Sequence, residues 1–158
     1  MITPPPPPIA IEHIISTSFA KRPDYICSFE IVLHQLATAH IPSLKNRICL
    51  LSCLENNWDG YGATKASEKV LKNTYKFMDA VCKTSYYLYL TNEDISLTPY
   101  GSIILDFKSN NGMVSVEIGS EKIGFFTDFN ANDNVYSDGI VSDFRSIPQA
   151  VVENLAKL

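Results

Sequence analysis

Three carboxylates are the residues best suited to chemistry. Asp106, Glu117 and Asp128 lie in a stretch where polar and apolar residues alternate. If this stretch folds into antiparallel strands, all three share one face of the sheet, and Asp106 and Glu117 lie on neighbouring strands. Paired carboxylates a few ångströms apart can hold Mg²⁺ or act as general acid and base. One hypothesis is therefore a small metal-dependent hydrolase or nuclease, although no lysine follows Glu117 by two residues, as it does in many nuclease sites.

The same face also carries apolar side chains, which favours a different function. The predicted register places Asp106 opposite Ser115. It also places Glu117 opposite Ile104, and Phe126 follows on the next strand. A sheet face that mixes acids with apolar residues is typical of a surface that binds another protein. The simpler alternative is a solvated face with scattered charges.

A second candidate site is the corner from Trp58 to Ala63, which contains two glycines. Two glycines within three residues permit a sharp reversal of the chain with positive φ angles. Asp59 can accept hydrogen bonds from backbone N–H groups two residues on, and Trp58 and Tyr61 add two large rings. The corner is therefore either a stiff connection between helices or an exposed loop that binds a partner through Trp58, Asp59 and Tyr61.

Lysines and cysteines are weaker candidates. Five lysines fall on the side of the helix expected at 67–84 that lies opposite its apolar residues: Lys65, Lys69, Lys72, Lys76 and Lys83. Surface helices ordinarily place their charges there, and this stripe lacks the arginines and aromatic residues of a nucleic-acid site.

Cys49 and Cys53 have no zinc-ligand spacing to other residues, so we expect buried free thiols. No nucleotide-binding or hydrolase motif is present, so no cofactor is expected.

Three of these stretches resemble a known family. Trp58–Ala63 matches a Trp-Asp-Gly-x-Gly-Ala corner, Pro99–Phe107 a Pro-x-Gly-x-Ile-x-Leu-Asp strand, and Ser115–Gly119 a Ser-Val-Glu-Ile-Gly strand. In this order and spacing the chain resembles a family of small uncharacterised bacterial proteins over about residues 43–158. Phe107 stands where that family more often has tryptophan. The resemblance implies a shared domain architecture and no particular activity.

Composition and charge narrow the class of protein. The chain has 158 residues, 46% of them hydrophobic and 19% charged, and a net charge of −4, which is typical of one globular domain. Residues 1–90 hold 9 basic and 7 acidic residues, whereas residues 91–158 hold 4 and 10. An acidic chain binds nucleic acid poorly, so the expected partner is another protein. No apolar segment is long enough for a bilayer and no signal peptide is evident, so we expect no membrane contact and a reducing cytoplasm.

The spacing of apolar residues predicts helices first and strands later. Helical spacing predicts helices over 28–39, 43–55 and 67–84, with Pro42 between the first two, and an aromatic run predicts a strand over 86–90. From residue 95 the period becomes two. This alternation predicts strands over 95–98, 102–108, 113–119 and 123–129, then a strand near 140–144 and a last helix over 147–157 capped by Ser146.

These elements predict an α+β fold, an antiparallel meander sheet with helices packed on one face. Residues 41–158 would form this domain, and residues 1–40 an N-terminal extension. Its proline-rich start, residues 1–10, is expected to be disordered. The predicted function is a non-catalytic protein-interaction module. By analogy of size and acidity, it resembles many toxin-neutralising or accessory subunits.

Overall fold

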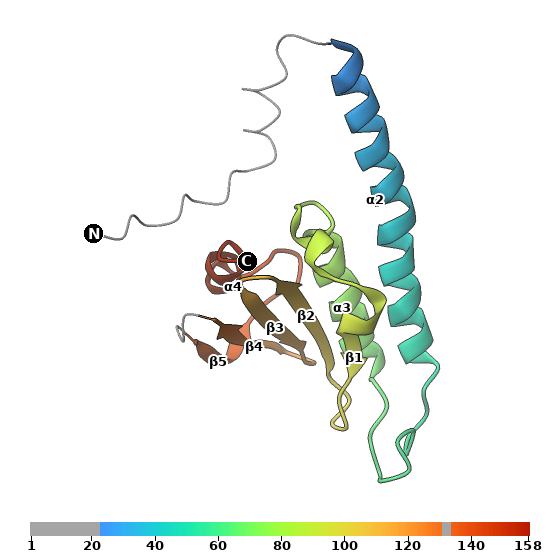
Figure 1. Cartoon of the computed structure of the whole chain (residues 1–158). Coiled ribbons are helices and arrows are strands. Elements are labelled where there is room, and N and C mark those ends of the chain that lie inside the picture. The colour runs from blue at the N-terminus through green and yellow to red at the C-terminus, as the bar shows by residue number, and fades with distance from the viewer. Residues whose placement is uncertain (1–22, 131–133) are drawn as a thin grey trace, which may run out of the picture. The chain divides into compact units, whose positions relative to one another are not determined.

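The computed structural model describes residues 23–130 and 134–158, with side chains from residue 38 onward. The prediction for residues 1–10 therefore lies outside the described residues. The chain divides into two units, Met1–His40 and Ile41–Leu158. The second unit holds the whole sheet, whose strands are labelled in Figure 1.

The first labelled helix, α2 (Pro23–Ser52), continues through Pro42 without a break. The sequence predicted two helices here, 28–39 and 43–55, because proline lacks the backbone N–H and crowds the preceding turn, at a cost of about 3 kcal/mol. One side of the helix after the proline is fully or almost fully buried, at Leu44, Ile48 and Leu51. Burial of each is worth about 1.5–3 kcal/mol, which offsets the proline. The predicted division and the predicted end at residue 55 were wrong.

Helix α3 (Glu68–Val81) confirms the helix expected over 67–84. The Ser67 side chain caps it by accepting a hydrogen bond from the Val70 N–H at 3.3 Å. Its predicted apolar side is buried: Val70, Thr74, Phe77, Met78 and Val81. The Thr74 hydroxyl donates to the Val70 carbonyl at 2.9 Å, so this polar group is satisfied inside the core.

Residues 86–90 were wrongly predicted to be a strand. They form a 3₁₀ helix, Tyr86–Tyr89, and a second one, Asn92–Asp94, follows. The aromatic run suggested β structure because strands favour such side chains. The backbone instead closes on itself, as in the hydrogen bond from the Leu90 N–H to the Tyr87 carbonyl at 3.2 Å.

Five antiparallel strands form a meander in the order β1-β2-β3-β4-β5, as the predicted α+β class requires. The strands are β1 (Ile95–Leu97), β2 (Ile103–Ser109), β3 (Gly112–Ile118), β4 (Lys122–Phe129) and β5 (Tyr136–Val141). The predicted register is confirmed. Asp106 pairs with Ser115, and Glu117 pairs with Ile104.

The two C-terminal elements differ from their predicted positions. β5 begins at Tyr136, ahead of the predicted 140–144, and Phe144 has a φ of 62° that is incompatible with a continuing strand. Helix α4 (Gln149–Leu155) has Pro148 at its N-cap and not Ser146. Proline suits the start of a helix because its missing N–H would have no partner there.

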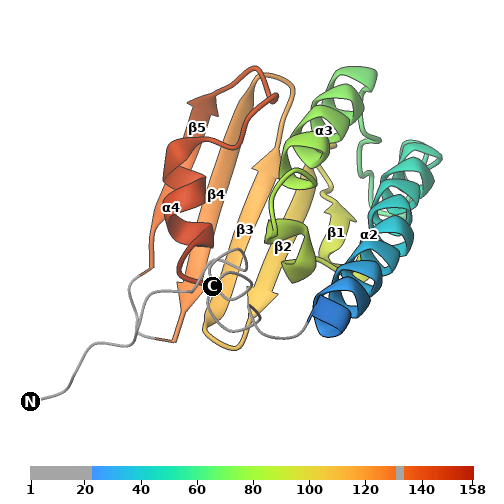
Figure 2. The same ribbon diagram turned by 90° about the horizontal axis from the view of Figure 1, so that it is seen from above.

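The core lies between the helices and one side of the sheet. α3 contacts β2 and β3, and α4 contacts β3. Figure 2 shows both helices in front of the strands. The core residues of the strands include Leu105, Phe107, Val114, Val116, Ile118, Ile123 and Phe125. Neither α3 nor α4 covers the other side of the sheet, where the carboxylates lie.

Candidate functional site

We call the side of the sheet away from the core the outer face. The pairing of β2 to β5 places these residues on it: Ile104, Asp106, Lys108, Met113, Ser115, Glu117, Lys122, Gly124, Phe126, Asp128, Tyr136, Asp138 and Val141. All strand residues named from the sequence as candidates for partner binding are therefore together on one surface.

Exposed aromatic residues meet where β4 and β5 pair on the outer face. Phe126 pairs with Tyr136, and the two residues are 42% and 71% exposed. Phe126 also lies opposite Ser115 of β3, and Val141, further along β5, is 79% exposed. Single exposed apolar residues are common, but adjacent aromatic residues on an uncovered sheet are typical of the centre of a protein interface.

Four carboxylates belong to the same face as this aromatic pair: Asp106, Glu117, Asp128 and Asp138. Loss of water contact and the charges of Asp138 and Glu117 raise the pKa of Tyr136 above its ordinary value. Gly124 lies opposite Glu117 and has no side chain that could separate Glu117 from Tyr136. The Tyr136 hydroxyl therefore stays neutral and lies within the field of these acids.

A buried hydroxyl holds Glu117 in place. The Ser102 Oγ donates to Glu117 Oε1, and Ser102 is 8% exposed. The Thr98 and Ser102 hydroxyls are hydrogen-bonded at 2.7 Å. Ser102 was not among the predicted site residues, because it precedes β2 and approaches Glu117 only through the strand register. This bond orients the Glu117 carboxylate.

The three carboxylates of the metal hypothesis do not form a ligand cluster. Glu117 pairs with Gly124, Asp106 with Ser115, and Asp128 with Met113, so the acids occupy three different rungs of the sheet. Neighbouring strands lie about 4.8 Å apart and successive outward positions along a strand about 6.6 Å apart. Among the described residues, no three histidine, cysteine or acidic side chains could hold a metal ion. The acids are spread over the face and not gathered at one point.

A lysine at one margin of this face forms an ion pair with a buried aspartate. Lys108 Nζ contacts Asp94 Oδ1 at 2.5 Å, with the Asp94 side chain 8% exposed. Asp94 also accepts from the Thr91 N–H at 2.8 Å and the Thr91 hydroxyl at 2.6 Å. Burial raises the pKa of Asp94, but the Lys108 and Thr91 donors outweigh burial and lower the pKa below its ordinary value of 3.8.

We expect Asp94→Asn to lower the free energy of unfolding by about 1.5–3 kcal/mol at pH 7, the worth of a hydrogen bond to a charged group. The folded-state pKa is depressed, so this stabilisation is present above the ordinary value of 3.8 and is lost as the pH falls through the lowered folded pKa. Urea unfolding of both proteins between pH 7 and pH 2 tests this. A difference that stays constant down to the lowest pH would contradict it.

The corner at 58–63 is held by its own polar side chains. Asp59 Oδ1 accepts from the N–H groups of Tyr61 at 2.8 Å and Ala63 at 3.1 Å. These two bonds lower the pKa of Asp59. Asn57, whose φ is 66°, accepts from the Gly62 N–H at 2.8 Å. Asp59 is therefore occupied in shaping the loop, as the structural alternative expected.

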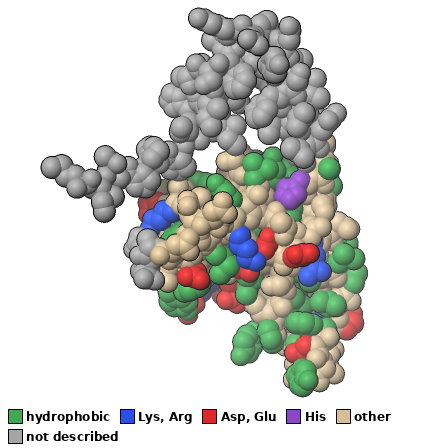
Figure 3. Space-filling model, in the orientation of Figure 1, with side chains coloured by type: hydrophobic (Ala, Val, Ile, Leu, Met, Phe, Trp, Pro, Cys, Tyr) green, Lys and Arg blue, Asp and Glu red, His purple; other side chains and the backbone are tan. Residues whose placement is uncertain are grey.

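The rings at this end of the domain are nevertheless exposed. Tyr61 is 95% exposed, and Trp58 is 36% exposed with its indole N–H 3.4 Å from the Thr64 carbonyl. The Thr64 N–H donates to the Pro99 carbonyl at 2.8 Å, which ties the corner to the β1–β2 turn. Tyr100 in that turn is 90% exposed. Figure 3 shows hydrophobic side chains projecting at the lower end of the view, where these two loops lie.

Two lysines of the predicted stripe form ion pairs, and two of the cysteines are exposed. Lys65 pairs with Glu55 at 2.7 Å, and Lys69 with Glu121 at 3.2 Å. Cys49 and Cys53 are free but exposed, so the expectation of buried thiols was wrong. The buried side of α2 carries Leu44, Ile48 and Leu51. Cys49 directly follows Ile48, so its side chain points about 100° away from that side. Cys82 is partly buried, and this burial raises the pKa of its thiol.

Comparisons with known proteins leave the family resemblance a prediction. No family model, no curated protein and no solved structure matches the chain. Among the described residues, no helix is both long enough and apolar enough to cross a membrane.

Proposed function

We propose that the protein is a non-catalytic interaction module that binds a partner protein through the outer face. The observation that carries this proposal is the pairing of exposed Phe126 and Tyr136 on a sheet surface that also bears four carboxylates. Aromatic residues dominate the buried centre of interfaces, and charged residues around them set orientation and association rate.

The charge of the outer face indicates the chemistry of the partner. The face carries four acids against Lys108 and Lys122, and Lys108 is already paired with Asp94. The complementary surface has an apolar centre flanked by lysine or arginine. A toxin-neutralising or accessory subunit with a basic partner fits this description, in a reducing cytoplasm where the exposed free thiols Cys49 and Cys53 stay reduced.

Asp106→Arg tests the electrostatic part of the proposal. The full-length protein and the variant capture proteins from native lysate, and the association rate is then measured with the purified protein that wild type captures. We expect an association rate lower by tenfold or more, because the variant places a positive charge before a basic partner. For wild type the rate should fall as salt rises from about 0.01 to 0.15 M, where the Debye length shortens from about 30 to 8 Å.

Glu153→Arg is the matched control, because it makes the same charge change on α4, which packs against the core side of the sheet. It should leave the association rate within about twofold of wild type. Thermal unfolding of both variants verifies the fold. Equal losses for the two variants, or an unchanged rate for Asp106→Arg, would contradict the proposed surface.

A further inference from the structure

A cavity of about 410 Å³, largely open to solvent, lies between α3, the β3–β4 turn and the loop before α4. Lys69, Asn73 and Lys76 line it from α3, Ser120 and Glu121 from the turn, and residues 142–145 from the loop. Sites for small molecules have volumes of roughly 300–1,000 Å³. These three segments are distant in the sequence, so no local motif could have indicated the cavity.

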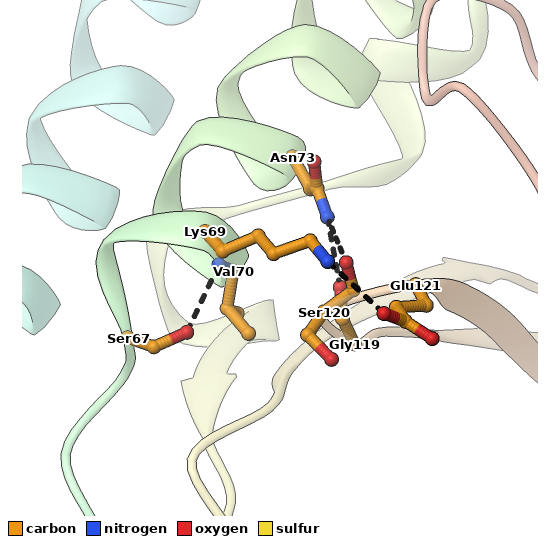
Figure 4. Close-up of polar contacts among 7 residues, drawn as sticks. All are labelled: Ser67, Lys69, Val70, Asn73, Gly119, Ser120 and Glu121. Atoms are coloured by element: carbon orange, nitrogen blue, oxygen red, sulfur yellow. Dashed lines mark hydrogen bonds and ion pairs between the residues drawn. The ribbon is translucent and has the colours of Figure 1, made fainter.

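The turn that forms one wall is tied to α3. The Asn73 side-chain amide donates to the Gly119 carbonyl at 3.1 Å and to the Ser120 carbonyl at 3.0 Å. Lys69 reaches across to Glu121 at 3.2 Å. Figure 4 shows Asn73 and Lys69 extending from the helix to the turn. Asn73 is 6% exposed, so this wall is part of the folded core.

The opposite wall is a short loop in a constrained conformation. Phe144 has a φ of 62° and is 3% exposed. The Ser142 side chain accepts from the Phe144 N–H at 3.0 Å, and the Asp143 side chain from the Arg145 N–H at 2.9 Å. A non-glycine residue at positive φ is strained, and such positions are enriched at binding sites. The hydrogen bonds hold the loop in the shape that lines the cavity.

Two cations in this cavity lack a carboxylate partner. Lys69 is paired with Glu121, but neither Lys76 nor Arg145 makes an ion pair with any residue that the structure describes. The Ser120 hydroxyl likewise makes no side-chain hydrogen bond within the described part of the chain. Lysine, arginine and hydroxyl donors that line one space are the groups that bind phosphate.

We propose that this cavity binds a small sugar phosphate. Lys76 and Arg145 contact the phosphate, with the Ser120 hydroxyl as a further donor. Asp143 and Glu121, which also line the cavity, each have carboxylate oxygens that can accept hydrogen bonds from sugar hydroxyls. The site is independent of the outer face, since α3 packs against the core side of the sheet.

Titration of the full-length protein with ribose 5-phosphate, followed by calorimetry and amide NMR, tests this proposal. We expect a Kd of about 1 mM or tighter and shifts at the amides of Ser120, Ser142 and Arg145. Ribose should not bind, and inorganic phosphate should bind at least tenfold more weakly than the sugar phosphate. No binding of ribose 5-phosphate, equal affinity for inorganic phosphate, or shifts confined to other amides would overturn the proposal.

Lys76→Gln and Arg145→Gln should each weaken binding of ribose 5-phosphate by tenfold or more. Lys72→Gln is the matched control, because Lys72 is an exposed residue of α3 that does not line the cavity. It should change the Kd by less than twofold. Circular dichroism verifies that the variants fold. Loss of affinity in Lys72→Gln equal to that in Lys76→Gln would show only general attraction of an anion to the helix and would overturn the site.

Discussion

Phe126→Asp is expected to reduce affinity for the partner by about 30-fold to 1,000-fold, which corresponds to the 2–4 kcal/mol of a typical aromatic hot spot. Phe126 pairs with both Ser115 and Tyr136, so it has neighbours of the outer face on both sides. Aspartate removes the ring and adds a fifth negative charge that the partner must desolvate. The equilibrium affinity, measured by calorimetry with the purified partner, is the readout.

The fold should tolerate this change, because Phe126 is already 42% exposed. The loss of strand propensity costs about 1 kcal/mol or less. Leu88→Asp is the matched control: Leu88 is 47% exposed and belongs to the 3₁₀ helix at 86–89, away from the outer face. It should bind the partner as wild type does. Normal affinity of Phe126→Asp, or an equal defect in Leu88→Asp, would remove Phe126 from the interface.

Gly112→Ala is expected to lower the free energy of unfolding by about 3–5 kcal/mol, the combined cost of backbone strain and overpacking. Gly112 has a φ of 147°, and an added Cβ would lie 2.8 Å from the Phe129 Cα and would also contact the Asp128 carbonyl oxygen. Gly112 pairs with Ser109 on one side and with Phe129 on the other. The clash therefore falls on the backbone of β4, which is held by its pairing with Gly112 at the first residue of β3.

Gly124→Ala separates this clash from the general effect of adding a methyl group to a strand. Its nearest atoms would be the Ser137 carbonyl oxygen at 3.6 Å and the Glu117 Cβ at 3.9 Å, which are ordinary contacts. We expect Gly124→Ala to be neutral or stabilising by up to about 1 kcal/mol. Denaturant unfolding measures both variants. Similar stabilities for the two would mean that the close approach at Gly112 does not exist.

The sheet could be predicted in detail because two local signals agree. Alternation from residue 102 onward assigns each side chain to a face, and the Asn-Asn-Gly turn sets the offset between β2 and β3. The pairing of Asp106 with Ser115 follows from these signals alone. β5 could not be placed, because its polar residues and the register shift opposite Ile123 and Phe125 of β4 break the alternation.

The helical half shows where local rules fail. Pro42 indicated a break, but burial of the apolar residues after it keeps the helix whole. The tyrosines at 86–89 indicated a strand, but short-range hydrogen bonds after α3 give a 3₁₀ helix. In both cases the deciding energy comes from contacts that single-residue propensities do not contain.

The candidate site was predictable only in part, for the same reason. The strand residues of the outer face follow from the register, whereas Tyr136 follows from the position of β5 and was missed. Ser102 reaches Glu117 from 15 positions away. The cavity beside α3 combines Lys76 with Arg145, which are joined only by the packing of the chain.

Site-specific photo-cross-linking tests the central claim most directly. A photoreactive phenylalanine analogue replaces Phe126 in one full-length protein and Leu88 in another, and both are irradiated in cells that make the protein naturally. The outer-face proposal predicts a discrete cross-linked product of higher mass from position 126 and none from position 88. No product from position 126, or the same products from both positions, would contradict it.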